Sequence, residues 1–175
     1  MSIESANPSS KMWDFSTILE VTIDRPAKEV WPYFHGKNKD AWTKTDYRTV
    51  KGQSGQVGEL YDMVYPMPNQ GGRLGFETLK VKADKHLIIK ITYQKHEGGN
   101  RELSGYDFLT LNEVAGRTTV VLLQASWLPV DPPTDCDHEA QKHNTFLTDI
   151  LQHLKKLVEG GPVSESRPGE SGPRA

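Results

Sequence analysis

DCDHEAQKHNTFLTDILQHLKKLV, residues 135–158, is the stretch that decides the fold, because it carries the longest uninterrupted helical pattern in the chain. Its apolar residues recur at steps of three and four, which places them in the single stripe of an amphipathic helix. The stripe comprises Phe146, Leu147, Ile150, Leu151, Leu154, Leu157 and Val158. A helix of about 22 residues is roughly 33 Å long, so this stripe needs a broad partner surface.

The N-terminal part of the chain predicts one strand and two short helices. Residues 13–24 alternate between apolar and polar side chains, which is typical of a half-buried strand. Pro26 ends this strand, and a short helix is expected to follow as far as Gly36. Pro32 lies inside that helix and shortens or kinks it, because proline has no backbone donor. A second short helical turn is expected around residues 40–42.

The middle of the chain alternates between strand patterns and turn residues. The predicted strands cover residues 46–51, 58–65, 73–83, 86–95, 104–113 and 117–128. Their connections are too short for crossover helices, so the strands are expected to be antiparallel. The sequence therefore predicts an α+β fold, in which a curved seven-stranded antiparallel sheet wraps around the long C-terminal helix.

A cavity follows from this combination of elements. Strands twist, so a sheet of about seven strands curves, and a straight helix cannot touch a curved sheet along its whole length. The gap between them is expected to be lined mainly by carbon and to hold a ligand.

Length and composition indicate one domain, residues 12–159, between a disordered leader, residues 1–11, and a disordered tail, residues 160–175. A net charge of -2 with both signs interspersed argues against nucleic-acid binding and against a polybasic membrane contact. Cys136 is the only cysteine, so an internal disulfide is excluded. No signal-peptide pattern and no spanning apolar run of about 18 residues occurs. We expect a soluble, cytoplasmic monomer or homodimer without a cofactor.

Several segments resemble the helix-grip superfamily, whose members are grouped as SRPBCC, START, Bet v 1-like and polyketide-cyclase-like proteins. The resemblance rests on residues 19–31 (LEVTIDRPAKEVW), Trp42, residues 55–59, residues 116–120 and the terminal helix, and it covers about residues 13–158. It implies a hydrophobic pocket for a lipid, sterol, polyketide or other aromatic small molecule. Some members are enzymes such as aromatase/cyclases, others carry or sense ligands, and one branch resembles the activator of the Hsp90 chaperone. No motif in the sequence selects one branch.

Two histidines near the start of the long helix invite comparison with a zinc pair. Such a pair needs histidines four residues apart, whereas His138 and His143 are five apart. Their rings then point roughly 140° apart, so no metal site is expected. His143 lies one turn before Leu147 and is predicted to point into the cavity. There it can act as an acid or base near neutral pH, or simply bond to a strand.

Two acidic residues are candidates for the inner face of the sheet. If Lys80 and Lys82 face water, Glu77 lies on the other side, where a carboxylate must be paired or shifted toward neutrality. A bulge near Gly75 would reverse this and put Glu77 outside, so both orientations remain open. Asp107 is in phase with leucines further along its strand and has the same ambiguity.

Aromatic side chains are the remaining candidates for a ligand site. Together with Asp107 and Leu147, the predicted ligand-binding residues are Tyr33, Trp42, Tyr61, Tyr65, Tyr93 and Trp127. Their rings suit a flat ligand, and their hydroxyl groups can bind an oxyanion. For any single member, packing in the core is the alternative.

These patterns lead to three hypotheses. The first is binding of a hydrophobic small molecule between sheet and helix, with Glu77 or His143 catalysing cyclisation, dehydration or lactone chemistry of a polyketide-like substrate. The second is a carrier or sensor with the same pocket and no chemistry. The third is a chaperone-interaction module, with a collapsed cavity and an exposed apolar patch on the outside of the sheet.

Overall fold

The computed structural model describes residues 11–65, 72–96, 99–101, 104–130 and 136–160. Apart from Lys11 and Gly160, the leader and the tail that the sequence predicts lie outside these residues.

The order of the elements is the predicted one. It runs β1 (Lys11–Ile23), α1 (Ala27–Val30), the 3-10 helix η1 (Trp31–Phe34), α2 (Gly36–Thr43), β2 (Asp46–Lys51), β3 (Leu60–Tyr65), β4 (Gly72–Lys82), β5 (His86–His96), β6 (Gly99–Arg101), β7 (Ser104–Val114), β8 (Arg117–Val130) and α3 (Cys136–Val158). Pro32 lies in η1, so the first predicted helix changes from an α-turn to a 3-10 turn where proline removes a backbone donor.

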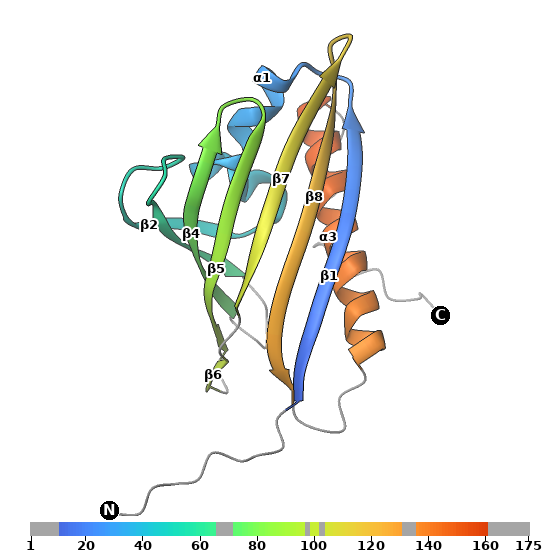
Figure 1. Ribbon diagram of the computed structural model, residues 1–175. Helices are drawn as coiled ribbons and strands as arrows, with labels where there is room; N and C mark the ends of the chain where they lie inside the picture. Colours follow the sequence, from blue (N-terminus) through green and yellow to red (C-terminus); the bar gives the residue numbers. More distant parts are fainter. Residues whose placement is uncertain (1–10, 66–71, 97–98, 102–103, 131–135, 161–175) are drawn as a thin grey trace, which may run out of the picture.

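The strands form one antiparallel sheet in the order β1-β8-β7-β5-β4-β3-β2, and the three-residue β6 pairs with β5 beside this path. The predicted seven-stranded antiparallel sheet is therefore confirmed, with β6 as an addition. The first strand pairs with the last along its whole length, from Lys11 opposite Val130 to Ile23 opposite Thr118. The curved sheet holds α3 on its concave side, behind β1 and β8 (Figure 1). The face that α3 covers is called the inner face below, and the other the outer face.

Two periodic patterns build the core. On β1, Phe15, Val21 and Ile23 are buried, whereas Ile18 between them is 69% exposed. On α3, the predicted stripe is buried at Leu147, Ile150, Leu151 and Leu154. Each fully buried side chain of this size contributes roughly 1.5–3 kcal/mol, so this stripe is what fixes α3 against the sheet.

The C-terminal half of α3 is also tied by polar contacts. The Lys155 ammonium donates to the Thr22 carbonyl at 2.6 Å, and the Asp24 amide donates to the Glu159 carboxylate at 2.7 Å. These bonds join the end of α3 to the end of β1.

The core is concentrated where α1 and α2 cover the concave side of the sheet. Ile23, Val30, Phe34 and Leu154 are all 2% exposed or less. Toward the end where α3 begins, inner-face side chains such as Leu19 and Asp107, and the neighbouring Thr17, keep accessible surface. The interior is therefore closed at one end and more open at the other.

Among the residues that the structure describes, no helix combines the length and the apolar character needed to cross a bilayer.

Candidate functional site

A line of three polar side chains crosses the interior from the sheet to α3. Asp107 on β7 and Gln124 on β8 are cross-strand neighbours, in phase with the inward pair Leu109 and Leu122. The Gln124 amide nitrogen donates to Asp107 Oδ1 at 2.7 Å, and the Gln124 oxygen contacts His143 Nε2 on α3. With the amide in this orientation, His143 must carry its proton on Nε2. We call this set the Asp107–Gln124–His143 line.

Burial shifts both ends of the line toward their neutral forms. Desolvation raises the pKa of Asp107, although the Gln124 hydrogen bond and the charge of Lys39 oppose the rise. Desolvation also lowers the pKa of His143. A carboxyl group with a raised pKa and an imidazole with a lowered pKa are thus held in one hydrogen-bonded unit.

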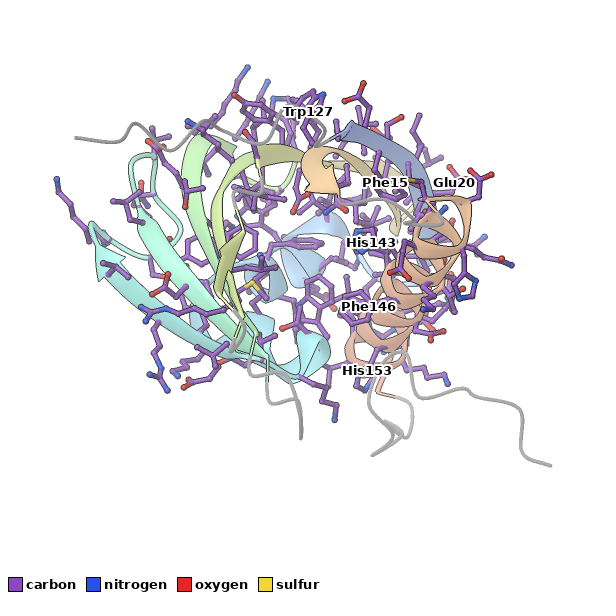
Figure 2. The ribbon with its side chains drawn as sticks, turned by 90° about the horizontal axis from the view of Figure 1, so that it is seen from below. Phe15, Glu20, Trp127, His143, Phe146 and His153 are labelled. Carbon is purple, nitrogen blue, oxygen red and sulfur yellow. The ribbon has the colours of Figure 1, made fainter. Side chains whose placement is uncertain are left out.

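The surroundings of His143 are aromatic and aliphatic. Phe15 on β1 meets its ring edge-on at 4.9 Å, and Phe146 lies one turn further along α3 with its ring 6.3 Å away. Leu147 is 7% exposed and continues the apolar stripe. Figure 2, which looks into the open end, shows His143 and Phe146 projecting from α3 on its sheet-facing side. The polar atoms of the line and the surrounding apolar side chains therefore face the same interior.

A buried lysine forms the second polar feature of the interior. Lys39 on α2 is 6% exposed, and its ammonium group donates to the Tyr61 hydroxyl at 3.2 Å. The nitrogen lies 5.2 Å from the Tyr61 ring centre and 5.5 Å from that of Phe76, both suitable for cation-π attraction. Desolvation lowers the pKa of Lys39 to about 8, against the opposing charges of Asp107, Glu59 and Asp40.

A stack of aromatic rings holds this lysine in place. The Tyr61 ring is stacked between Tyr47 at 4.5 Å and Phe76 at 5.1 Å. The Tyr47 hydroxyl donates to the Glu59 carboxylate at 2.5 Å, and burial first, then this contact, raises the pKa of Tyr47. Glu59 is 1% exposed, so the stack is anchored on a buried carboxylate.

The structure brings five of the predicted site residues into the interior: His143, Asp107, Tyr61, Leu147 and Trp42. Trp42 is a core residue whose indole donates to the Tyr33 carbonyl at 2.7 Å. Tyr33 itself packs against the core and is partly buried. Tyr65 and Tyr93 lie in strands, but their side chains are outside the described part of the chain.

The inward orientation considered for Glu77 is corrected by the register of β4. This strand shifts register between Gly75 and Phe76 and again after Thr78. Phe76 and Thr78 are buried, and Glu77 between them pairs with Leu60 on one side and Lys90 on the other. The bulged alternative therefore holds, and Glu77 lies on the outer face.

Trp127 is also corrected. Leu122 and Gln124 occupy inner-face positions of β8. Side chains alternate between the two faces of a strand, so Trp127, three residues after Gln124, lies on the outer face. It is 38% exposed, and its ring meets Tyr106 edge-on at 6.3 Å. Trp127 consequently does not line the interior.

Of the polar interior residues described above, Gln124, Lys39 and Glu59 were not among the sequence candidates. Gln124 had a usable signal, because it continues the phase of Val120 and Leu122. The sequence contains no signal for the burial of Lys39, since a lysine in a short helix is ordinarily exposed.

Two further places around α3 are less informative. His138 is exposed while His143 faces inward, and among the described residues no group of three His, Cys, Asp or Glu side chains is placed to hold a metal ion. A surface hollow of about 460 Å³ lies on a polar flank of α3. Its lining residues are Asp137, Ala140, Gln141, Asn144, Thr145, Thr148 and Asp149. This hollow is not the expected cavity between sheet and helix, which stays a prediction.

Comparison with known proteins gives a fold and no family. No protein-family model matches the chain, and no curated protein matches it. Solved structures do match. A conserved protein from Geobacillus kaustophilus superposes with a TM-score of 0.69 at 8% identity, covering 83% of this chain and 96% of that one.

Two further solved structures come from named systems. The Aha1 dimer from Colwellia psychrerythraea has a TM-score of 0.60 at 17% identity, covering 84% of this chain and 98% of that one. DynU16, a protein of the dynemicin biosynthetic locus, has a TM-score of 0.53 at 16% identity. That match covers 85% of this chain but 49% of DynU16, so the chain spans about half of its length. At these identities the likeness is one of fold alone, and the fold is the helix-grip fold.

Proposed function

We propose that the open end of the interior binds a hydrophobic small molecule, whose polar group bonds to the Asp107–Gln124–His143 line. The observation that carries this proposal is the unused bonding capacity of the line. Asp107 Oδ2 and His143 Nδ1 have no partner among the described residues, although both side chains face the interior. Neither atom is among the fully buried polar atoms that lack a partner, so both are open to a molecule that enters the interior, and the polar group of a ligand would bond to them.

The neighbouring side chains support an apolar ligand. Phe15, Phe146 and Leu147 surround the line, and Leu19 faces the same interior. Ligand sites commonly combine such apolar walls with a few convergent polar groups. The similarity of fold to DynU16, which comes from a biosynthetic locus, is consistent with a small-molecule role.

Binding can be tested with N-phenyl-1-naphthylamine, an uncharged hydrophobic probe whose fluorescence rises in an apolar site. Thr17 faces the accessible interior, whereas its neighbour Ser16 faces outward. We expect saturable binding that Thr17→Trp weakens about tenfold or more by occupying the space, while the matched control Ser16→Trp leaves it unchanged. Equal binding by both variants, or no saturable binding by the unaltered protein, would overturn the proposal.

The line also suits acid–base chemistry on a carbonyl compound. His143 Nδ1 can accept a proton from the carbon beside the carbonyl while the Asp107 carboxyl donates one to the carbonyl oxygen, which gives an enol. This step begins aldol cyclisation and dehydration. Deuterium uptake by 2-tetralone in D₂O measures it: catalysed uptake that His143→Gln abolishes indicates an enzyme, and bound but unexchanged ketone indicates a carrier.

A second candidate function, self-association, is favoured by an apolar row on the outer face. Ile18, Leu123, Phe108 and Ile88 are consecutive cross-strand neighbours, and Ile18 is 69% exposed. Leu123, Phe108 and Ile88 are half-buried, and a partly exposed apolar row of this kind is expected at an interaction surface. The solved Aha1 structure of similar fold is a dimer.

The charges beside this row are self-complementary. Glu20 lies beside it on β1, and Lys80 and Lys82 lie beyond it on β4. A twofold axis parallel to the strands would place Glu20 of one copy opposite Lys82 of a second copy, with the two apolar rows packed together.

Sedimentation velocity over a concentration series tests this second candidate. We expect a dimer that Glu20→Lys weakens and that the double variant Glu20→Lys with Lys82→Glu restores, while Glu29→Lys, away from the row, has no effect. A monomer at every concentration would exclude self-association.

A further inference from the structure

Lys39 is a buried cation whose hydrogen bonds are mostly unmade. Its ammonium group has three N–H donors, and the Tyr61 hydroxyl at 3.2 Å is its one hydrogen-bond acceptor among the described residues. The side chain is 6% exposed, so bulk water is not at hand to replace the missing partners. Burying a charge without a paired counter-charge is costly.

The carboxylates near Lys39 are engaged elsewhere. Glu59 accepts from Tyr47 and Thr49 through one oxygen and from the Gly55 amide through the other. Asp107 accepts from Gln124. None of them forms an ion pair with Lys39 in the described part of the chain.

Asp40, the remaining carboxylate that acts on Lys39, is occupied as well. It accepts from the Tyr47 amide at 2.7 Å and lies 3.7 Å from the Lys37 ammonium on the exposed side of α2. The opposing charges around Lys39 therefore act on it from a distance and leave the direct coordination sites of its nitrogen unfilled.

The position of the nitrogen is nevertheless fixed. The stacked rings of Tyr61 and Phe76 hold it by cation-π attraction, and α2 supplies the backbone. A preorganised, buried cation with free donors has the properties of an anion-binding site.

We propose that Lys39 binds a carboxylate, so that the ligand of this protein is a hydrophobic carboxylic acid. This inference rests on the proposed function and specifies its substrate class. The carboxylate accepts hydrogen bonds from the Lys39 ammonium group, and the apolar part of the ligand extends toward Phe15 and Leu147.

A pH dependence accompanies this arrangement. The titratable groups that interact with Lys39 are Tyr61, Asp107, Glu59, Asp40 and His35, and burial lowers the pKa of Lys39 to about 8. Its charge is present below that value and is lost as the pH rises through it. Carboxylate affinity is therefore expected to fall between about pH 7 and about pH 9.5, whereas the affinity for an uncharged ligand stays level.

Displacement of N-phenyl-1-naphthylamine by decanoic acid and by 1-decanol tests the inference, because the two competitors differ mainly in charge. We expect decanoic acid to displace the probe at a concentration about tenfold lower than 1-decanol. Lys39→Met should abolish this preference and keep the melting temperature, since it removes an unpaired buried charge. Lys37→Met, which alters an exposed lysine of the same helix, should retain the preference.

The outcomes separate this inference from the proposed function. Probe binding without a preference for the acid, or a preference that survives in Lys39→Met, overturns the carboxylate site and leaves the binding function intact. Failure of the probe to bind overturns both. If Lys39→Met does not fold, the pH series on the unaltered protein decides: a preference that does not fall with rising pH contradicts the inference.

Discussion

Glu59 illustrates how single residues set up this interior. Its buried carboxylate accepts from the Tyr47 hydroxyl at 2.5 Å, the Thr49 hydroxyl at 2.9 Å and the Gly55 amide at 2.7 Å. These donors come from β2 and from the loop before β3. One side chain thus joins that loop to the ring stack under Lys39.

Removing this acceptor should destabilise the whole fold. Glu59→Met keeps the length of the side chain but leaves the Gly55 amide without its acceptor and two hydroxyls without theirs. We expect the free energy of unfolding in urea to fall by at least about 2 kcal/mol. Glu59→Gln should cost less, because its amide can turn its oxygen to Gly55 and donate to the hydroxyls.

The matched control is Glu29→Gln, an exposed carboxylate 3.7 Å from Arg25. It should change stability little. Equal stability of the Glu59 and Glu29 variants would show that the buried hydrogen bonds contribute nothing.

Individual residues also show where sequence patterns stop being informative. The phase of Asp107 with the leucines of β7 is visible in the sequence but left its orientation open, and in the structure Asp107 lies on the inner face. Lys39 could not be predicted, because its burial depends on how α2 packs over β3 and β4. Trp127 was assigned to the interior by its chemistry alone, and the phase of β8 contradicts that assignment.

At the scale of elements, α2 and α3 are joined by a buried histidine. His153 Nδ1 donates to the Trp42 carbonyl at 3.1 Å, and His153 is 7% exposed. Its Nε2 is buried without a partner among the described residues. Burial first, then the charges of Lys44 and Lys156, lower the pKa of His153, while the Trp42 carbonyl opposes the shift.

This lowered pKa predicts a loss of stability in acid. The unfolded chain takes up the proton near the ordinary pKa of about 6.5, whereas the folded chain resists it to a lower pH. Stability is therefore fully present above about pH 6.5 and falls as the pH drops toward the folded-state pKa. His35 and His143 have lowered pKa values as well, so the unaltered protein should show their combined slope.

His153→Asn offers an amide that can still donate to the Trp42 carbonyl but does not titrate. Urea midpoints measured from about pH 8 to about pH 5 should decline less steeply in this variant. His138→Asn, at an exposed position of the same helix, should retain the slope of the unaltered protein. An unchanged slope in His153→Asn would mean that this histidine is not coupled to folding.

Elements differed in how well their sequences predicted them. The alternation on β1 and the stripe on α3 gave nearly the correct boundaries, because each has one buried and one exposed face. The orientation of Glu77 on β4 stayed open, since two register shifts interrupt the alternation and neither has a distinct sequence signature. The contact between α2 and α3 could not be predicted, because it joins a histidine to a backbone carbonyl far away in the sequence.

On the scale of the whole molecule, the two ends of the interior differ. One end is covered by α1, η1 and α2, and there Lys155 donates to the Thr22 carbonyl and Glu159 accepts from the Asp24 amide, at the end of β1. At the other end, Asp107 and His143 retain accessible surface. Local opening should therefore require less free energy at the open end.

Amide hydrogen exchange can measure this asymmetry. Amides of residues 140–146 in α3 should exchange faster than those of residues 150–156, although both stretches are helical. Saturation with N-phenyl-1-naphthylamine should slow the faster group and leave the slower one nearly unchanged. Protection confined to residues 150–156 would place the probe at the wrong end of the molecule.

The side-chain amide of Gln124 can adopt two orientations, which give the interior two hydrogen-bonding arrangements. With Asp107 ionised, the amide nitrogen points to Asp107 and the oxygen accepts from His143. If a bound ligand protonates Asp107, the Gln124 amide can flip by 180°. Asp107 then donates to the amide oxygen of Gln124, and Nε2 of His143 accepts from the amide nitrogen, so that His143 carries its proton on Nδ1. His143 Nδ1 is therefore an acceptor in the first arrangement and a donor in the second, and the change needs no movement of the backbone.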